Sequence, residues 1–283
     1  MTILVTGARG DVGGAVLAGL AAAGEPVRAS SRAPRAGEFP GGVEVARADL
    51  TDPASWPAAL AGVRKVFLYA HPEGAAEFAV EFAVTAREAG VEHVVLLSSS
   101  TVLYPDAAAN PIAVRHVAAE RALDEAGLDR TFVRPGYFAT NALRWWQSIR
   151  TGRVLRTAFP EAVTSPVHER DIAQVAVRAL LDDTHRGAAY PVLGAGPVTV
   201  REQVAAIAAA LGEPVRLEEV DVDTYRAQLL TQRPGPLVER VLQGRGSVPQ
   251  LPAELATDAV PQILGRPALP FAAWARDHAA DFR

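Results

Sequence analysis

The stretch TILVTGARGDVGG, residues 2–14, decides the fold of this chain. Residues 3–5 form a short apolar run that is typical of a buried strand, and residues 15–23 are rich in alanine and leucine, as expected of a helix. Between them lie Gly7, Gly10 and Gly13, each three residues apart. This order of strand, glycine turn and helix is the context that a dinucleotide-binding turn requires.

Each of these glycines has its own physical role in such a turn. Gly7 allows the tight bend, Gly10 lets the backbone approach a pyrophosphate, and Gly13 lets the helix pack close to the strand. The phosphates then meet unpaired N–H groups at the helix N-terminus. An ordinary strand–helix turn is the alternative, but the correct context on both sides favours nucleotide binding. The expected cofactor residues of this loop also include Thr6, Arg9, Asp11 and Val12.

Composition narrows the class of protein. The 283 residues suit one large domain or one domain with an appended lobe, and 49% hydrophobic content supports a substantial core. A net charge of −4 without a basic block argues against nucleic acid as a partner, and the short apolar runs argue against a membrane span. With the first strand at Thr2 there is no room for a signal peptide, so we expect a cytoplasmic protein.

Some chemistries are excluded outright. The chain has no cysteine, which rules out disulfides, thiolate metal sites and a cysteine nucleophile. No set of His, Asp and Glu has metal-ligand spacing, so no metal is expected. Lys65 is the only lysine, and lysine-dependent catalysis would have to involve it.

Further strand-like runs alternate with helical segments along the first two thirds of the chain. They lie at residues 26–30, 43–46, 65–70, 93–98, 130–134 and 190–193. This alternation predicts an α/β fold, a Rossmann doubly wound parallel sheet with helices on both faces. Asp171 is expected to cap a helix that ends at Leu181, and Thr199 to cap another.

The later chain differs in composition and predicts a small, mainly helical C-terminal substrate lobe. We expect an NADP-binding Rossmann domain over residues 1–153, with contributions from about 165–195, and the lobe over 196–283. In doubly wound sheets the ligand lies beyond the carboxyl ends of the strands. A lobe at that edge would close over the substrate.

The residues after the second strand bear on the choice of cofactor. An NAD site places an acid there to hold the ribose 2′-hydroxyl, but residues 29–32 (ASSR) contain none. Arg32, with Ser31 and Arg9, suits a 2′-phosphate through charge-assisted bonds, which favours NADP(H). Arg32 could instead be a solvated loop residue. Asp49 and Leu50 either border the adenine or belong to a local turn.

The chain also resembles a known family. Matching segments are the loop 6–13, VFLYA at 66–70, LSSS at 97–100, His116-x-x-x-Glu120, GLDRTFVRPG at 127–136, Asn141 and Val167-x-x-x-Asp171. They resemble the NmrA-like group of atypical short-chain dehydrogenases/reductases, and most of all its NADPH-dependent quinone-oxidoreductase-like branch. The resemblance implies a Rossmann fold that binds NADP(H), with a variable small lobe for the substrate.

One departure from the wider superfamily concerns proton transfer. Typical short-chain dehydrogenases use Tyr-x-x-x-Lys, in which the lysine lowers the tyrosine pKa. This chain has no such pair, because Lys65 lies at the start of the fourth strand and position 61 is alanine. The corresponding helix begins at Asn110-Pro111 and carries His116 and Glu120 on one face. Either His116 relays a proton while Glu120 orients it, or the pair only anchors the nicotinamide ribose.

Other polar and aromatic residues are weaker candidates. Tyr104 could supply a catalytic phenol or lie on a surface loop, and Trp145 could stack on a planar aromatic substrate or pack into the lobe. The remaining expected cofactor residues are Ala70, His71, Pro72, Ser98, Ser99, Pro135 and Tyr137. The expected substrate residues are Ser100, Tyr137, Phe138, Asn141 and Trp145.

These features together predict an NADPH-dependent reductase of a quinone, an enone or a carbonyl compound. Quinones and enones suit a site without Tyr-Lys because they need little acid assistance. Two alternatives stay open: a non-catalytic NADP(H)-binding redox sensor, and a cofactor-assisted enzyme of non-redox tailoring. The expected partner is a small molecule, and the chain is expected to be a monomer or a homodimer.

Overall fold

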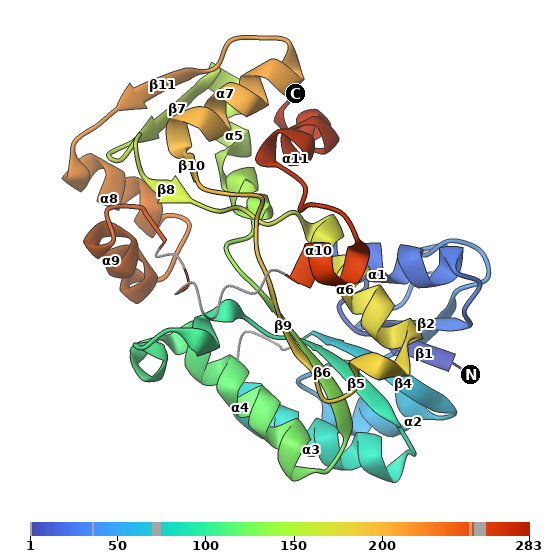
Figure 1. The fold of residues 1–283 in the computed structure, drawn as a ribbon. Coiled ribbons are helices and arrows are strands. Elements are labelled where there is room, and N and C mark those ends of the chain that lie inside the picture. Colours follow the sequence, from blue (N-terminus) through green and yellow to red (C-terminus); the bar gives the residue numbers. More distant parts are fainter. Residues whose placement is uncertain (1, 36, 70–74, 249–250, 252–258) are drawn as a thin grey trace. The chain divides into compact units, whose positions relative to one another are not determined.

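The computed structural model describes residues 2–35, 37–69, 75–248, 251 and 259–283 (Figure 1). By its internal contacts the chain divides into two compact units. The first unit comprises Met1–Pro135, Glu169–Val192 and Ala253–Arg266; the second comprises Gly136–His168, Leu193–Pro252 and Pro267–Arg283. The first segment of the first unit ends at Pro135, whereas the sequence suggested a domain boundary at residue 153.

A parallel sheet forms the centre of the first unit. It is seven-stranded, in the order β3-β2-β1-β4-β5-β6-β9, and its neighbours all pair in parallel. The strands are β1 (Thr2–Val5), β2 (Val27–Ser31), β3 (Glu44–Arg47), β4 (Val63–Tyr69), β5 (His93–Leu97), β6 (Asp129–Pro135) and β9 (Ala189–Val192). This confirms the doubly wound fold. The strand order reverses between β1 and β4, where such sheets bind ligands at the carboxyl ends of the strands.

Helices cover both faces of this sheet (Figure 1). On one face α1 (Asp11–Ala22) packs against α6 (Glu169–Leu181), which also contacts α10 (Ala259–Leu264). On the other lie α2 (Trp56–Leu60), α3 (Ala75–Glu88) and α4 (Pro111–Glu125). Short 3₁₀ turns complete the unit: η1 (Pro53–Ser55), η2 (Ser100–Leu103), η3 (Ala107–Ala109) and η5 (Asp183–His185).

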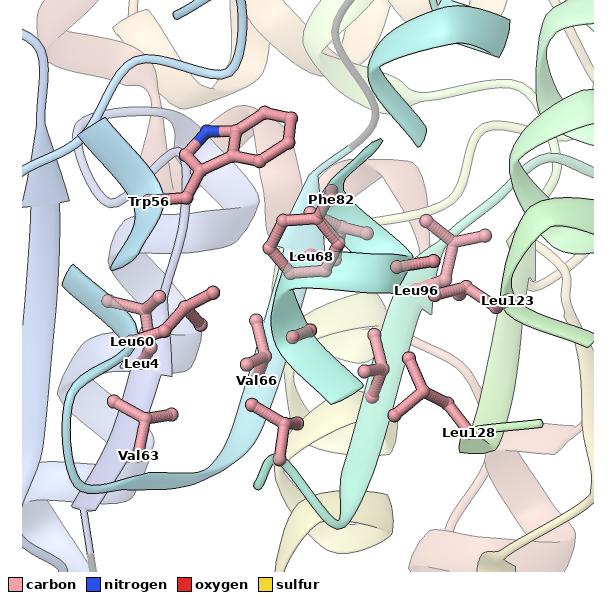
Figure 2. Packing of buried hydrophobic residues seen from close by; sticks show 14 of the residues in the cluster. Leu4, Trp56, Leu60, Val63, Val66, Leu68, Phe82, Leu96, Leu123 and Leu128 are labelled. Atoms are coloured by element: carbon pink, nitrogen blue, oxygen red, sulfur yellow. The ribbon is translucent and has the colours of Figure 1, made fainter. Parts of the chain in front are cut away.

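The core beneath α2, α3 and α4 is built from apolar strand residues and a few large side chains (Figure 2). Trp56 and Phe82 meet edge to face with ring centroids 5.5 Å apart. Leu68 and Leu96 supply neighbouring strand residues, and Leu123 packs from α4. Strands buried on both faces explain the unbroken apolar runs seen in the sequence.

Helix starts follow the expected capping rules in one case and not in another. Asn110 caps α4 as expected, since its Oδ1 accepts a bond of 3.1 Å from the Ile112 N–H. The expectation that Asp171 caps α6 is wrong, because the helix begins at Glu169. Asp171 is instead buried in the first turn, where it accepts a 2.6 Å bond from Arg266. The N-terminal end of the helix dipole favours an acid at either place.

The single lysine has a structural role. Lys65 lies in β4 with its side chain 5% exposed. Its Nζ donates to the Leu180 carbonyl and to Asp183 Oδ1, both at 2.7 Å. Lys65 therefore ties the sheet to the end of α6, and its charge is already matched.

The second unit is mainly helical, with two small sheets. β8 (Val163–Thr164) pairs antiparallel with β10 (Val198–Thr199), and β7 (Val154–Thr157) pairs parallel with β11 (Arg216–Glu219). The helices are α5 (Trp146–Gly152), α7 (Val200–Leu211), α8 (Val222–Leu230), α9 (Gly235–Gln243) and α11 (Phe271–Asp277), with η4 (Ala139–Trp145) and η6 (Ala279–Phe282). Thr199 caps α7 in a capping box with Glu202, as expected.

The core of the second unit packs α5, α7 and α11 around Trp274, which is fully buried with Ile149, Ile207 and Phe282. In the part of the chain that the structure describes, no helix has both the length and the apolar character needed to cross a bilayer.

Candidate cofactor and active site

The glycine loop between β1 and α1 has little room for side chains. Gly7 has a φ of +63°, a left-handed conformation that favours glycine. A Cβ on Gly13 would lie 2.2 Å from the Gly7 carbonyl oxygen, closer than any side chain tolerates. Gly10 precedes α1 without a side-chain cap. The loop thus leaves the first turn of α1 open toward an anion, and these residues fit a dinucleotide pyrophosphate.

The other expected residues of this loop differ in what they contact. The Thr6 hydroxyl donates to the Phe67 carbonyl at 3.1 Å and accepts from the Tyr69 N–H at 2.7 Å. It therefore joins β1 to β4 just where the cofactor is expected. Val12 is buried, and Asp11 is an exposed acid in the first turn of α1.

The loop after β2 contains a carboxylate that the sequence analysis did not anticipate. Glu38 pairs with the Arg9 guanidinium, and it accepts hydrogen bonds from Ser31 Oγ at 3.5 Å and from the Arg35 N–H at 3.0 Å. Arg9 also donates to the Ala33 carbonyl at 2.9 Å. Two of the donors expected for a 2′-phosphate thus converge on one carboxylate. Arg32 is exposed beside them.

Asp49 makes the local turn that was one of its two alternatives. Its Oδ1 accepts from the Thr51 N–H and hydroxyl at 2.9 and 2.8 Å, and its carbonyl accepts from Trp56 Nε1 at 2.8 Å. Leu50 packs against the core beneath α2 and α3. Both residues nevertheless follow β3 at the edge where an adenine is expected.

A buried ion pair links α4 to β5 and β6. Glu120 is 8% exposed and pairs with Arg134 through two bonds, Nε–Oε1 at 2.8 Å and Nη2–Oε2 at 2.6 Å. Ser98 Oγ donates to the same carboxylate at 2.6 Å. Glu120 is therefore occupied by Arg134 and Ser98, and these bonds fix α4 against the ends of both strands.

His116 lies one turn before Glu120 on α4, half-buried. Burial is the main cause that lowers the pKa of His116 to about 4; Arg115 lowers it further, and Glu120 partly opposes the shift. The ring is neutral at neutral pH, and its Nδ1 is buried without a hydrogen-bond partner among the described residues. An unpartnered buried ring nitrogen suits a ligand hydroxyl, such as one on a cofactor ribose. No hydrogen bond joins His116 to the Glu120 carboxylate in the described structure.

The turn after β5 holds the remaining candidates of the first unit. Ser99 caps η2 and accepts from the Thr101 N–H at 3.2 Å, whereas Ser100 is buried. Tyr104 hydrogen-bonds to Ser100, and burial raises its pKa above the ordinary value. Pro135 is buried at the end of β6. Ala70, His71 and Pro72 lie outside the described residues.

The residues expected to bind substrate from Tyr137 onward all belong to the second unit. The Tyr137 carbonyl accepts from the Val167 N–H at 2.7 Å, and Asn141 Nδ2 donates to the Phe138 carbonyl at 3.0 Å. Trp145 packs against the core around Trp274. Within the described residues no group of three or more His, Asp or Glu could hold a metal ion.

Comparison with known proteins identifies the family of the chain. A family model described as NAD(P)H-binding matches residues 7–183, which covers the glycine loop and α4. This chain belongs to that family. It is an NAD(P)H-binding protein of the NmrA-like, quinone oxidoreductase type among the atypical short-chain dehydrogenases/reductases, as its motifs predicted.

Two curated relatives match this chain over nearly its whole length. The chain is 40% identical over 281 residues to a (4-alkanoyl-5-oxo-2,5-dihydrofuran-3-yl)methyl phosphate reductase of Streptomyces griseus, with 99% of each covered. It is 34% identical over 287 residues to an NAD(P)H azoreductase of Xenophilus azovorans, again with 99% of each covered. Its fold is similar to that of an NADPH-dependent quinone oxidoreductase of Escherichia coli complexed with NADPH, with a TM-score of 0.75, 24% identity and 98% and 99% of the two chains covered.

This family member is therefore an NAD(P)H-dependent oxidoreductase. Of the classes expected from sequence, the reductase is the one that both full-length relatives share. Two residues important to the site were missed. Glu38 lies beyond residues 29–32, where an acid that binds the ribose 2′-hydroxyl is expected. Arg134 was noted only as part of the GLDRTFVRPG motif. An arginine in an otherwise apolar strand was the available signal for a buried ion pair.

Proposed function

We propose that the protein reduces an activated double bond, in a quinone, an enone or an unsaturated lactone, with NADPH as the reductant. The bound cofactor supplies a hydride to one carbon, and a proton from solvent reaches the other end of the conjugated system. The observation that carries this proposal is the lack of a strong acid among the described candidates. His116 is neutral at neutral pH, and Tyr104 has a raised pKa. Lys65, the only lysine, is paired with Asp183.

Such a site favours substrates whose acceptor carbon is already electron-poor. A simple ketone needs a proton donor as the alkoxide forms, whereas a quinone or enone spreads the developing charge over its own conjugated system. The relatives support this choice, since one is named for a dihydrofuranone and another for azo reduction.

The test is a panel of acceptors with purified protein and NADPH, followed by loss of the reduced-nicotinamide absorbance and by product analysis. We expect a naphthoquinone and an unsaturated lactone to be reduced at least about 100-fold faster than a saturated ketone of the same size, because acid catalysis contributes about that factor. Equal rates for the saturated ketone would contradict the proposal, as would no oxidation of NADPH with any acceptor.

His116 is proposed to hold the cofactor ribose through its unpartnered Nδ1. H116A then weakens NADPH binding by up to about tenfold, the worth of one hydrogen bond. The matched control is V117A, the exposed neighbour on α4. If H116A instead slows turnover while NADPH affinity stays unchanged, His116 acts in proton transfer and not in cofactor binding.

NADPH is proposed over NADH because Arg9 and Ser31 already converge on an anion at the end of β2, with Arg32 exposed beside them. Calorimetric titration with NADPH, NADP⁺, NADH and NAD⁺ tests the preference. R32E is expected to shift selectivity toward NADH, and unchanged selectivity would remove Arg32 from the site. A planar aromatic substrate and a monomeric or homodimeric state remain predictions.

A further inference from the structure

The arginines of the second unit differ in whether a carboxylate neutralises them. Pairs with glutamates among the described residues include Arg153 with Glu213, Arg156 with Glu218, Arg201 with Glu161, Arg216 with Glu218 and Arg226 with Glu239. Arg144 and Arg233 pair with no carboxylate among the described residues, yet both act on the phenol of Tyr137. Arg144 and Arg233 therefore bring two guanidinium charges to one tyrosine, with no described carboxylate to neutralise them.

The three side chains come from separate elements of the same unit. Tyr137 follows β6, Arg144 lies in η4, and Arg233 lies between α8 and α9. Arg233 hydrogen-bonds to the Tyr137 side chain. Because a guanidinium has only donors, the phenol oxygen accepts this bond and its own proton is free for another acceptor.

No carboxylate of the described residues acts on Tyr137 or Arg144 in this cluster. Arg233 Nε is buried without a hydrogen-bond partner among the described residues, and Arg144 is exposed to solvent. Arg144 is nevertheless partly desolvated, which lowers its pKa, and the neighbouring charge of Arg233 lowers it further. Burial raises the pKa of Tyr137, so the phenol stays protonated. Two repelling cations and a buried unpaired donor are costly unless an anion joins them.

We propose that Arg144, Arg233 and the Tyr137 hydroxyl bind the phosphate group of a phosphate monoester substrate. Guanidinium groups match phosphate oxygens in paired, charge-assisted hydrogen bonds, and the phenol adds a further donor. This inference rests on the proposed reductase function and narrows its substrate to a phosphorylated acceptor. It assigns residues to the group that appears in the name of the Streptomyces griseus relative, a methyl phosphate reductase.

The experiment compares a (4-alkanoyl-5-oxo-2,5-dihydrofuran-3-yl)methyl phosphate with the corresponding alcohol, both with saturating NADPH. The measured quantity is the ratio of kcat/KM for the phosphate to kcat/KM for the alcohol. We expect a large ratio in the unaltered protein, and a ratio about 30-fold smaller in R144M or R233M, the worth of one charge-assisted hydrogen bond. Y137F tests the phenol in the same assay. The control is R150M, an exposed arginine of α5 in the same unit, which is expected to keep the ratio.

A binding measurement distinguishes a phosphate bound at Arg144 and Arg233 from one bound at the cofactor site. Inorganic phosphate is titrated calorimetrically into the NADPH-saturated protein, so that the cofactor's own phosphates already occupy their site. Heat that disappears in R144M supports the proposal, and heat that persists in this variant contradicts it. R144M changes an exposed side chain and so keeps the test available should R233M fail to fold.

The outcomes distinguish this inference from the proposed function. If neither the phosphate nor the alcohol nor any quinone is reduced, the proposed function fails. If acceptors are reduced but the phosphate has no advantage over the alcohol, only the phosphate site is overturned. It is equally overturned if R144M and R150M change the ratio by the same factor.

Discussion

Removing the charge of Glu38 is expected to strengthen NADPH binding. The Glu38 carboxylate pairs with Arg9 and accepts from Ser31, the donors proposed for the 2′-phosphate. A bound 2′-phosphate must either displace this carboxylate or lie beside it. In E38Q the side chain keeps nearly the same shape, but Arg9 is released and the repulsion disappears.

The size of the effect follows from Coulomb's law. The Arg9 side chain is 47% exposed and that of Glu38 10%, so the effective dielectric lies nearer that of water than that of a protein interior. Two unit charges about 5 Å apart then interact by about 1–2 kcal/mol. E38Q should therefore lower the Kd for NADPH by about tenfold at low salt, with a smaller change at high salt.

Fluorescence titrations of NADPH and NADH with the unaltered protein, E38Q and E44Q measure this directly. E44Q is the control, because Glu44 on β3 pairs with Arg28 on β2 and not with Arg9. The Kd for NADH should stay unchanged. An unchanged or weaker NADPH affinity in E38Q would refute the reasoning. Weaker NADH binding would show that Glu38 holds a ribose hydroxyl.

Three further changes test the structure. G13A should abolish detectable NADPH binding, because its Cβ would lie 2.2 Å from a backbone carbonyl, whereas G41A, with open space around its Cβ, should bind normally in the same titration. Stability should fall on acidification: burial lowers the pKa of the fully buried His93 to about 4, so the unfolded chain binds the extra proton between about pH 6.5 and 4. The free energy of unfolding in urea should fall by up to about 3 kcal/mol between pH 7 and pH 4 through this residue. If H93Q shows the same dependence of the unfolding free energy on pH, the assignment to His93 is wrong. R134M leaves the Glu120 carboxylate buried without its cation and should cost about 3–5 kcal/mol of unfolding free energy in the same assay at pH 7, whereas a loss below about 1 kcal/mol would show that the pair contributes little.

Local sequence patterns predicted the parts of the fold that local physics determines. The glycine spacing ending at Gly13 identifies the turn because only glycine fits there. Asn110 before Pro111 indicates a helix start through one short hydrogen bond. The apolar strands and the parallel sheet follow from burial on both faces. The glycine turn and the helix start depend on residues that are near one another in the chain, and each strand's apolar pattern is likewise local.

The features that were missed depend on contacts between distant residues. Asp171 was expected to cap a helix, but Arg266, 95 residues away, pairs with it inside the first turn. In one of the two alternatives the Glu120 carboxylate orients His116, but its oxygens bind Arg134 and Ser98 in the structure. Spacing along one helix shows which residues share a face, but it does not show which neighbour on another element reaches a carboxylate first.

The burial of Lys65 has a practical consequence for labelling and immobilisation. The sequence contains no other lysine, and the Nζ of this one is held by the Leu180 carbonyl and Asp183 inside the first unit. Dyes, cross-linkers and resins that react with amines therefore find no accessible side-chain amine on the folded protein. Lys65 would react with such a reagent only when the first unit unfolds, so the extent of its modification measures the unfolded fraction.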